Sequence, residues 1–387
     1  MDIQQAPQAT DRKYYIDWIR VSAFFLLIFF HCTMPFVGFY KWEVRNATSS
    51  IWLDRLIIWL HQWRIPLLFF ISGTGIYFSL RKRSVMAFAG ERFVRLFIPL
   101  LFAMFFTIPL QVYYEKLQKG KISGSYAEFY PSVWKMIPYP EGTLSWSHMW
   151  YVVYLFVFCI LLLPVFGVFK ISAMQRLKDS VADFLSRPYI IILLFIPLML
   201  EFFSFYIKFP EQASLLDDWM LFTFSLTLLL YGYFLGSSTR FWITCERYRY
   251  HFLLVALVCA IALYKGYWWD ISFPKQQDKR LYIYGFINAL HIWAMILGFC
   301  GLAKKHLNFS NSFLQFANKA VYPFYIIHQT VIVAIGYYVV QLNASIAIKL
   351  PLLIFISFLL IAGIYYWLIR PFSLTRFLFG MKREKKK

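Results

Sequence analysis

The stretch from Tyr15 to His31 reads YIDWIRVSAFFLLIFFH and combines a long apolar run with Asp17, Arg20 and His31. Its length and composition predict a helix that enters a lipid bilayer. Arg20 and His31 are eleven residues apart, about three helical turns, so they share one face of that helix and lie roughly 16 Å apart along its axis. Ionisable side chains inside a membrane span are costly and indicate a functional site. We therefore centre the candidate site on this pair.

The composition of the whole chain is that of a membrane protein. Of its 387 residues, 60% are hydrophobic and only 15% are charged, which excludes an ordinary soluble enzyme. Aromatic residues make up 22%, as is typical of lipid contacts and interfacial belts. The net charge of +20 comes from basic clusters that flank apolar segments, and no nucleic-acid-binding motif accompanies them. We therefore expect the lipid bilayer, and no nucleic acid, as a partner.

Ten apolar segments have the length of membrane spans, so the predicted fold is an all-α polytopic membrane protein with about ten transmembrane helices. The stretch before the second span, Ile51 to His61, is amphipathic and either lies along the interface or extends that span. The predicted spans are 16–37, 63–80, 93–114, 148–169, 188–207, 219–237, 251–269, 281–303, 319–341 and 350–370.

The basic residues predict the orientation of these spans. With the N-terminus inside, 25 of the 39 Lys and Arg residues lie on the inner side and 14 on the outer side, so both termini are expected in the cytoplasm. We predict a cytoplasmic segment over 1–14, one membrane domain over 15–370 and a basic cytoplasmic tail over 371–387. No small-residue cleavage site follows the first apolar run, which predicts an uncleaved first span.

Several other kinds of site are not indicated by the sequence. The five cysteines form no close pair, and no His-x-x-x-His or Gly-x-Ser-x-Gly motif is present. We therefore expect neither a metal nor a bound cofactor. Ser72 and Gly73 end the stretch RIPLLFFISG and predict close packing between helices, because small side chains let helices approach.

Two arginines mark the inner end of the third predicted span. Arg92 and Arg95, in ERFVRLFIP, are three residues apart and project from one side of a helix. Two adjacent guanidinium groups suit a phosphate-bearing ligand, because their planar forks pair with phosphate oxygens. Arginines at an inner helix end are also what the positive-inside rule supplies, and that alternative stays open.

Histidines gather in the outer half of the predicted spans, where five of the seven are found: His31, His61, His148, His291 and His328. Histidine titrates near neutrality and is the usual general base. Most single histidines in a span pack rather than react, so we expect His61 and His291 to be packing or gating residues. His31 is set apart by its alignment with Arg20.

Other polar residues of the outer half are also open to either a structural or a functional role. His148 begins a span in SWSHMWYVVYL, where Trp150 also suits interfacial anchoring. We expect Glu201 to be a paired structural carboxylate. Arg64 is suited to stabilising a developing oxyanion or to holding the carboxylate of a dicarboxylic acyl group.

Arginines at the cytoplasmic face and a histidine deeper in the membrane on the same helix face predict a long ligand with a phosphate group at one end. Acyl-coenzyme A has this shape. Its phosphates would bind the inner arginines while the pantetheine arm carries the thioester towards mid-membrane. His31 would then take the proton from an acceptor hydroxyl that arrives from the outer side.

The spacing of Arg20 and His31, with ten residues between them, resembles the first-span signature of the acyltransferase-3 family of membrane O-acyltransferases. The sequence Arg92-Phe-Val-Arg95 is similar to the R-x-x-R signature of the same family. Four stretches between Tyr15 and about Arg370 resemble the glucan branch of that family, whose members acylate periplasmic glucans with succinyl groups. In one departure from that branch, Gln329 follows His328 where a second histidine is usual. The four stretches are YYIDWIR, HQWRIPLLFFISG, SHMWYVVYL and ANKAVYPFYIIHQTVI.

The resemblance implies transfer of an acyl group, succinyl or acetyl, from cytoplasmic acyl-CoA to a hydroxyl of an extracytoplasmic carbohydrate at the bacterial inner membrane. His31 would be the general base, with Arg20 held by its neighbour Asp17, and direct transfer and an acyl-His31 intermediate both stay open. The alternative is a membrane carrier for a polysaccharide or small anion, which would not consume acyl-CoA. The resemblance implies that Arg92 and Arg95 lie on the donor side. Arg64, His148 and His328 match other stretches of the family, and we expect these three and Trp150 on the acceptor or transition-state side.

Overall fold

The computed structural model describes residues 12–206, 208–209, 214–275 and 278–382, and the regular structure of these residues is helical throughout. In this part of the chain, eight helices are long and apolar enough to cross a membrane, which confirms an all-α membrane protein. Two shorter apolar helices, Ser147–Leu161 and Trp219–Leu235, occupy the fourth and sixth predicted spans. The eight are Tyr14–Phe36, Ile51–Leu80, Val85–Gln118, Pro188–Phe205, Thr239–Trp268, Arg280–His306, Ser312–Val339 and Ile346–Ile369.

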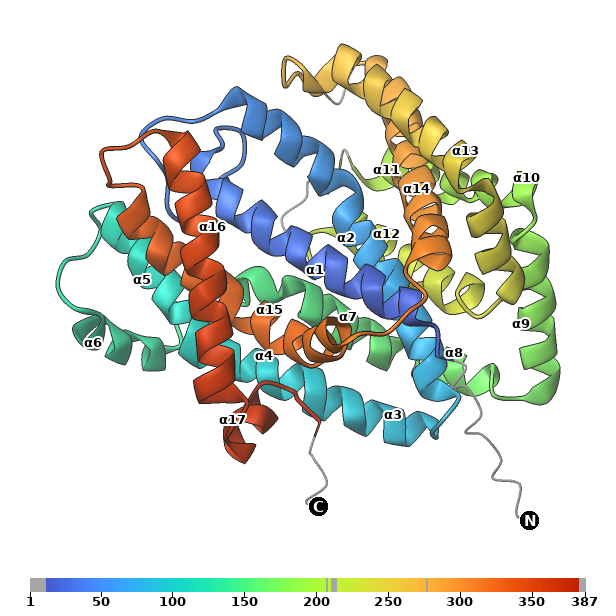
Figure 1. Cartoon of the computed structure of the whole chain (residues 1–387), viewed down its shortest axis with the longest axis horizontal. Coiled ribbons are helices and arrows are strands. Elements are labelled where there is room, and N and C mark those ends of the chain that lie inside the picture. Colours follow the sequence, from blue (N-terminus) through green and yellow to red (C-terminus); the bar gives the residue numbers. More distant parts are fainter. Residues whose placement is uncertain (1–11, 207, 210–213, 276–277, 383–387) are drawn as a thin grey trace.

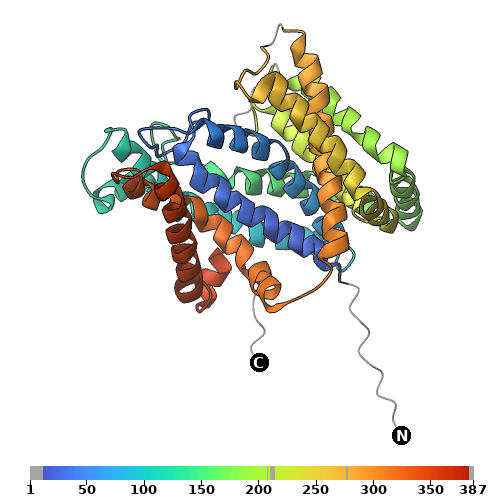
Figure 2. The ribbon, with the colours of Figure 1, turned by 45° about the horizontal axis from the view of Figure 1, so that its top comes forward.

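Helix α1 (Tyr14–Thr33) runs through the interior of the bundle, and half of its residues are buried. It packs beside α15 (Ser312–Val339), as both views show (Figures 1 and 2). It also contacts α2 (Ile51–Leu80), α14 (Arg280–His306) and α16 (Ile346–Gly363). Of the ionisable residues of α1, Asp17 and His31 are partly buried, as expected of such groups within a bundle, and Arg20 is exposed. A short 3₁₀ turn, η1 (Met34–Phe36), leads out of α1 into the loop 37–50.

Helix α2 (Ile51–Leu80) is one continuous helix, so the stretch Ile51 to His61 extends the second span. It packs closely against α12 (Trp219–Leu235). A side chain at Gly73 of α2 would collide with the backbone of α12, and one at Gly232 of α12 would collide with the backbone of α2. The close packing predicted from Ser72 and Gly73 is therefore confirmed.

The third span is longer than predicted and contains two π-helical turns. It runs without a break from α3 (Val85–Arg92) through η2 (Phe93–Phe97), α4 (Ile98–Phe102) and η3 (Ala103–Thr107) to α5 (Ile108–Gln118). Beyond it, α6 (Tyr126–Phe129) and η4 (Tyr130–Lys135) form part of the long loop between the third and fourth predicted spans.

The fourth predicted span, 148–169, is helical but interrupted rather than one continuous helix. It consists of η5 (Ser147–Met149), α7 (Trp150–Leu161) and α8 (Leu163–Val168), with Leu162 between the two α-helices. Pro164 explains the break, since its ring nitrogen has no N–H to donate to the preceding turn.

The remaining helices flank this centre on two sides. On one side, α13 (Thr239–Leu263) and α14 (Arg280–His306) form an extensive pair, which α11 (Phe195–Phe205) and α9 (Ser172–Leu185) flank (Figure 1). Short turns complete this side, namely α10 (Pro188–Ile191), η6 (Ile192–Leu194) and η7 (Tyr264–Trp268).

On the other side, α16 (Ile346–Gly363) packs along α15 and continues into η8 (Ile364–Ile369) and α17 (Ser373–Leu378). The chain end folds back on the third span, since the carbonyl of Gly380 accepts a hydrogen bond from Nε of Arg95 at 3.1 Å. Most of the predicted N-terminal segment (residues 1–11), residue 207 of the fifth predicted span and the end of the tail (383–387) lie outside the described residues.

Candidate functional site

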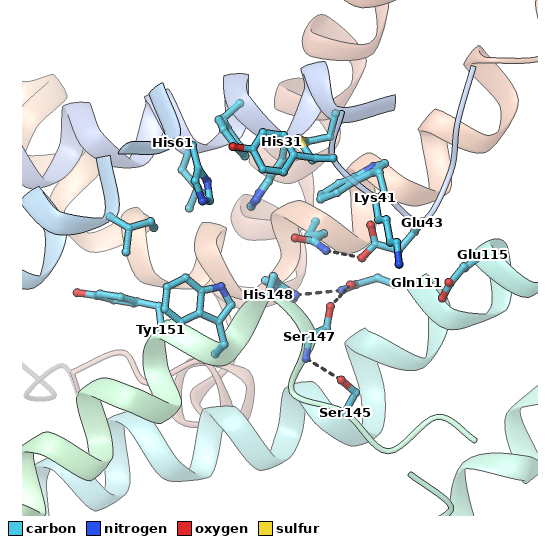
Figure 3. A pocket seen from close by; sticks show the side chains of 18 of the residues that line it. His31, Lys41, Glu43, His61, Gln111, Glu115, Ser145, Ser147, His148 and Tyr151 are labelled. Carbon is cyan, nitrogen blue, oxygen red and sulfur yellow. Dashed lines mark hydrogen bonds between the residues drawn. The ribbon is translucent and has the colours of Figure 1, made fainter. Parts of the chain in front are cut away.

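A cavity of about 520 Å³ lies beside the C-terminal end of α1 (Figure 3). Its walls come from α1, α2, α5, α15, the start of α7 and the loops that lead out of α1 and into α7. The residues predicted for the outer side meet here, because His31, Arg64, His148 and Trp150 line it and His328 contacts His31. His61, predicted as a packing or gating residue, also lines this cavity.

Two of the polar residues noted in the sequence lie elsewhere. His291 is buried in α14, where Nδ1 lies 2.9 Å from the carbonyl oxygen of Ala256. Glu201 of α11 accepts a hydrogen bond from the hydroxyl of Thr227 at 2.5 Å. Neither residue lines the cavity that holds His31.

His31 forms a hydrogen-bonded pair with the fully buried His328 of α15. Nδ1 of His31 lies 2.8 Å from Nε2 of His328, and Nδ1 of His328 lies 2.6 Å from the backbone carbonyl oxygen of Tyr325. A carbonyl oxygen only accepts, so Nδ1 of a neutral His328 carries the proton and its Nε2 accepts. Nδ1 of His31 must then donate, and Nε2 of His31 is left unprotonated. These partners fix His31 in the tautomer that a general base needs.

His148 is held by a second network, and both of its ring nitrogens are used. Nε2 lies 3.1 Å from the carbonyl oxygen of Ile326 and so carries the proton, while Nδ1 accepts from the amide of Gln111 at 3.2 Å. The same amide nitrogen donates to Thr330 at 2.7 Å, and the Gln111 oxygen accepts from the hydroxyl of Ser147 at 3.0 Å (Figure 3). His148 therefore builds the cavity wall and offers no free base. Gln111 was missed at the sequence level, although it is a polar residue within an apolar span.

Arg64 of α2 brings a buried positive charge to the cavity. Its side chain is almost fully buried, and its guanidinium carbon lies 3.7 Å from the ring centroid of Phe30. Its Nε and Nη1 atoms are buried and donate to no residue that the structure describes. Buried donors without a partner are costly, so these N–H groups are suited to an anionic group of a ligand.

The loop 37–50 lines one wall of the cavity with residues that sequence reasoning missed. The indole of Trp42 stacks on His31, with ring centroids 5.2 Å apart. Glu43 accepts a hydrogen bond from the amide of Gln329 at 2.7 Å. Burial, with a smaller contribution from the nearby carboxylate of Glu115, raises the pKa of Glu43 to about 7. The sequence offers no signal for this contact, because Glu43 and Gln329 are 286 residues apart in the chain.

Tyr151 of α7 lines the cavity one turn into the fourth span (Figure 3). Its hydroxyl lies 2.5 Å from that of Ser72 on α2. A second, mostly apolar cavity of about 640 Å³ adjoins the first, and the two share Tyr40, His61, Ile65 and Trp150 as lining residues.

Asp17 and Arg20 lie near the other end of α1, and neither lines the cavity. Arg20 donates to Asp17 at 3.0 Å, so the contact expected between these two residues is present. Asp17 also accepts from Arg12 at 2.7 Å, and Arg20 donates to Asn318 of α15 at 2.5 Å. Arg20 thus links α1 to α15 about three turns from His31.

Arg92 and Arg95 gather around Glu91, a residue not singled out from the sequence. Nη1 of Arg95 lies 3.2 Å from Oε1 of Glu91, Nη2 of Arg92 lies 4.0 Å from its Oε2, and Arg83 contacts the same carboxylate. Arg92 also donates to Ser79 at 3.3 Å, and its Nε is buried and bonded to no described residue. Three arginines around one carboxylate leave excess positive charge, which suits phosphate groups.

The described part of the chain holds no group of three or more His, Cys, Asp and Glu side chains arranged to bind a metal. The five cysteines are all buried free thiols.

A family model described as an acyltransferase domain matches residues 13–370. Glucans biosynthesis protein C of Escherichia coli (strain K12) is 29% identical over 163 residues, which cover 41% of this chain and 40% of that protein. The protein of the same name from Salmonella paratyphi B is 27% identical over 164 residues, again 41% of this chain and 40% of the relative. The matched regions thus span about two fifths of these curated relatives. No solved structure gives a significant match. Because the family model covers nearly the whole chain, the protein belongs to the acyltransferase-3 family.

Proposed function

We propose that the protein transfers an acyl group, succinyl or acetyl, from cytoplasmic acyl-CoA to a hydroxyl of an extracytoplasmic carbohydrate such as a periplasmic glucan. The observation that carries this proposal is the His31–His328 pair, which leaves Nε2 of His31 as a base on a residue that lines a cavity. Family membership supports the reaction class. The names of the relatives support a glucan as the acceptor.

The proposed topology has ten spans with both termini in the cytoplasm of a bacterial inner membrane. The eight long apolar helices and the two shorter ones support the number of spans. The excess of Lys and Arg on the N-terminal side supports the orientation. In this orientation the cavity faces the outer half of the membrane, and Arg20, Arg92 and Arg95 lie at the inner ends of their helices.

In the proposed reaction, Nε2 of His31 takes the proton of an acceptor hydroxyl while that oxygen attacks the thioester carbonyl. The imidazolium that forms is stabilised by its Nδ1–H bond to His328 and by the stacked indole of Trp42. The free N–H groups of Arg64 stabilise the oxyanion of the tetrahedral intermediate. The C–S bond then breaks, the proton returns from His31 to the departing thiolate, and CoA leaves as the free thiol.

On the donor side, Arg92 and Arg95 bind the phosphates of acyl-CoA in exchange for Glu91. Arg20, held by Asp17 and Asn318, adds positive charge at the inner end. The pantetheine arm then extends past Tyr151 towards His31. CoA is therefore a co-substrate in this proposal, and no resident cofactor is required.

Release of CoA tests the proposal directly. The purified protein in detergent is incubated with acetyl-CoA or succinyl-CoA and a periplasmic glucan, and free thiol and the mass of the glucan are followed. We expect thiol release together with an acyl mass increase on the glucan, both lost in His31→Ala. A carrier would release no CoA, so the absence of thiol release in a folded wild-type protein would contradict the proposal.

A further inference from the structure

The loop 37–50 is held rigidly across the cavity by hydrogen bonds at both ends. Near its start, the backbone N–H groups of Gly38 and Phe39 donate to the carboxylate of Asp54 at 2.9 and 2.8 Å. Near its end, the backbone of Arg45 exchanges two hydrogen bonds with the side chain of Gln118, at 2.7 and 2.9 Å. The residues between these anchors are thereby fixed on the cavity wall (Figure 3).

Glu43 lies between these anchors, and its two carboxylate oxygens have different surroundings. Oε1 accepts the amide hydrogen bond from Gln329 at 2.7 Å. Oε2 is buried and accepts from no residue that the structure describes. A buried carboxylate oxygen without a donor is costly, so an arrangement that keeps one beside a cavity indicates that a ligand supplies the donor.

Glu43 is connected to the proposed catalytic pair on both sides. Its chain neighbour Trp42 stacks on His31, at 5.2 Å between ring centroids. Its partner Gln329 directly follows His328, whose Nε2 lies 2.8 Å from Nδ1 of His31. Glu43 therefore lies on the wall from which an acceptor would approach the base.

We propose that Glu43 binds the acceptor, with Oε2 accepting a hydrogen bond from one hydroxyl of a sugar whose other hydroxyl is presented to His31. Gln329 acts as the positioning residue, because its amide holds Oε1 and so orients the carboxylate. This inference rests on the proposed acyl transfer and names the acceptor by its chemistry, as a compound with at least two neighbouring hydroxyl groups. The aromatic side chains of Tyr40, Trp42 and Trp150 on the same cavity offer flat faces for the C–H side of a sugar ring.

The charged surroundings of Glu43 agree with such a role. Glu115 of α5 and Lys119, directly after α5, face it, and these two form an ion pair with each other at 2.5 Å. The hydroxyl of Tyr139 lies close enough to interact with Glu43, and Lys41 of its own loop, His31 of α1 and Gln329 of α15 line the same cavity. Its pKa of about 7 means that the ionised form, the stronger acceptor, becomes dominant above neutrality.

Steady-state kinetics with Glu43→Gln and Gln329→Ala test the inference, with a glucan as acceptor and thiol release as the readout. Hydrogen bonds to charged groups contribute enough that we expect the KM for the acceptor to rise about ten- to hundredfold in Glu43→Gln, with kcat within about threefold of wild type. Gln329→Ala is expected to raise the same KM, by a smaller factor. The KM for acyl-CoA is expected to stay unchanged in both variants.

Glu201→Gln is the matched control, because Glu201 is a carboxylate with one oxygen bonded to Thr227 and the other buried without a described donor, and it does not line the cavity. It should leave the acceptor KM within about twofold. An acceptor KM in Glu43→Gln equal to that of wild type, or a lost kcat with an unchanged KM, would overturn the inference while leaving the acyl transfer intact. No thiol release from wild type would instead be the failure of the proposed function. Thermal stabilisation by acyl-CoA shows that each variant is folded.

Discussion

Nδ1 of His31 lies 2.8 Å from Nε2 of His328, although 297 residues separate the two in the chain. The carbonyl of Tyr325 determines that Nδ1 of His328 carries the proton, and His328 in turn determines that Nδ1 of His31 carries its proton. A buried imidazole thus takes the orienting position that a carboxylate holds in many catalytic sites. An imidazole adds no negative charge next to the thioester, so the orienting group does not offset the positive charge of Arg64 on the same cavity.

Removing the orienting ring should weaken the base. We expect His328→Ala to lower kcat about a hundredfold, because His31 loses both its fixed tautomer and the acceptor that stabilises its imidazolium. Thiol release at saturating acyl-CoA and glucan measures this, and thermal stabilisation by acyl-CoA should be retained. His291→Gln is the matched control, since His291 is equally buried but lies outside the cavity. Equal kcat in His328→Ala and wild type would remove the pair from the mechanism.

Arg64 should act in the transition state rather than on the ground-state donor. We expect Arg64→Ala to lower kcat about a hundredfold or more with acetyl-CoA and succinyl-CoA alike, because both donors form the same oxyanion. The measurement is kcat and KM for the two donors side by side. An effect confined to succinyl-CoA would show instead that Arg64 holds the distal carboxylate of the acyl group.

Much of the fold follows from the sequence, because long apolar segments flanked by basic residues specify helices and their approximate bounds. The shared face of Arg20 and His31 also follows, since it needs only the period of one helix. The contacts of His31 with His328 and of Glu43 with Gln329 do not, because they depend on how α1, α15 and the loop 37–50 pack together. Periodicity within one helix carries no information on that packing.

The inner arginines should govern binding of the donor. We expect Arg92→Ala to raise the KM for acyl-CoA about tenfold, since it removes a charge-assisted contact to phosphate. Glu91→Gln should lower that KM, because the carboxylate that competes with phosphate loses its charge. Thermal stabilisation by free CoA checks both variants without an acceptor. Arg81→Ala is the control for a basic residue at the same inner end, since Arg81 is exposed and precedes the third span. Equal CoA stabilisation in wild type and Arg92→Ala would show that Arg92 does not bind the donor and serves only the positive-inside rule.

The raised pKa of Glu43 also predicts how stability depends on pH. Burial lifts this pKa from 4.5 to about 7, so the unfolded chain releases the proton at lower pH than the folded protein does. Stability contributed by the protonated carboxyl is therefore complete below about pH 4.5, declines as the pH rises towards 7 and changes little above that. Glu43→Gln cannot ionise at this position, so its Tm should exceed that of wild type by a margin that widens between pH 5 and about pH 7 and then levels off. Thermal unfolding of both proteins in one detergent across this range measures the margin. A constant offset between the two curves would mean that Glu43 titrates at its ordinary pKa, as it would if its carboxylate were solvated rather than buried beside the cavity.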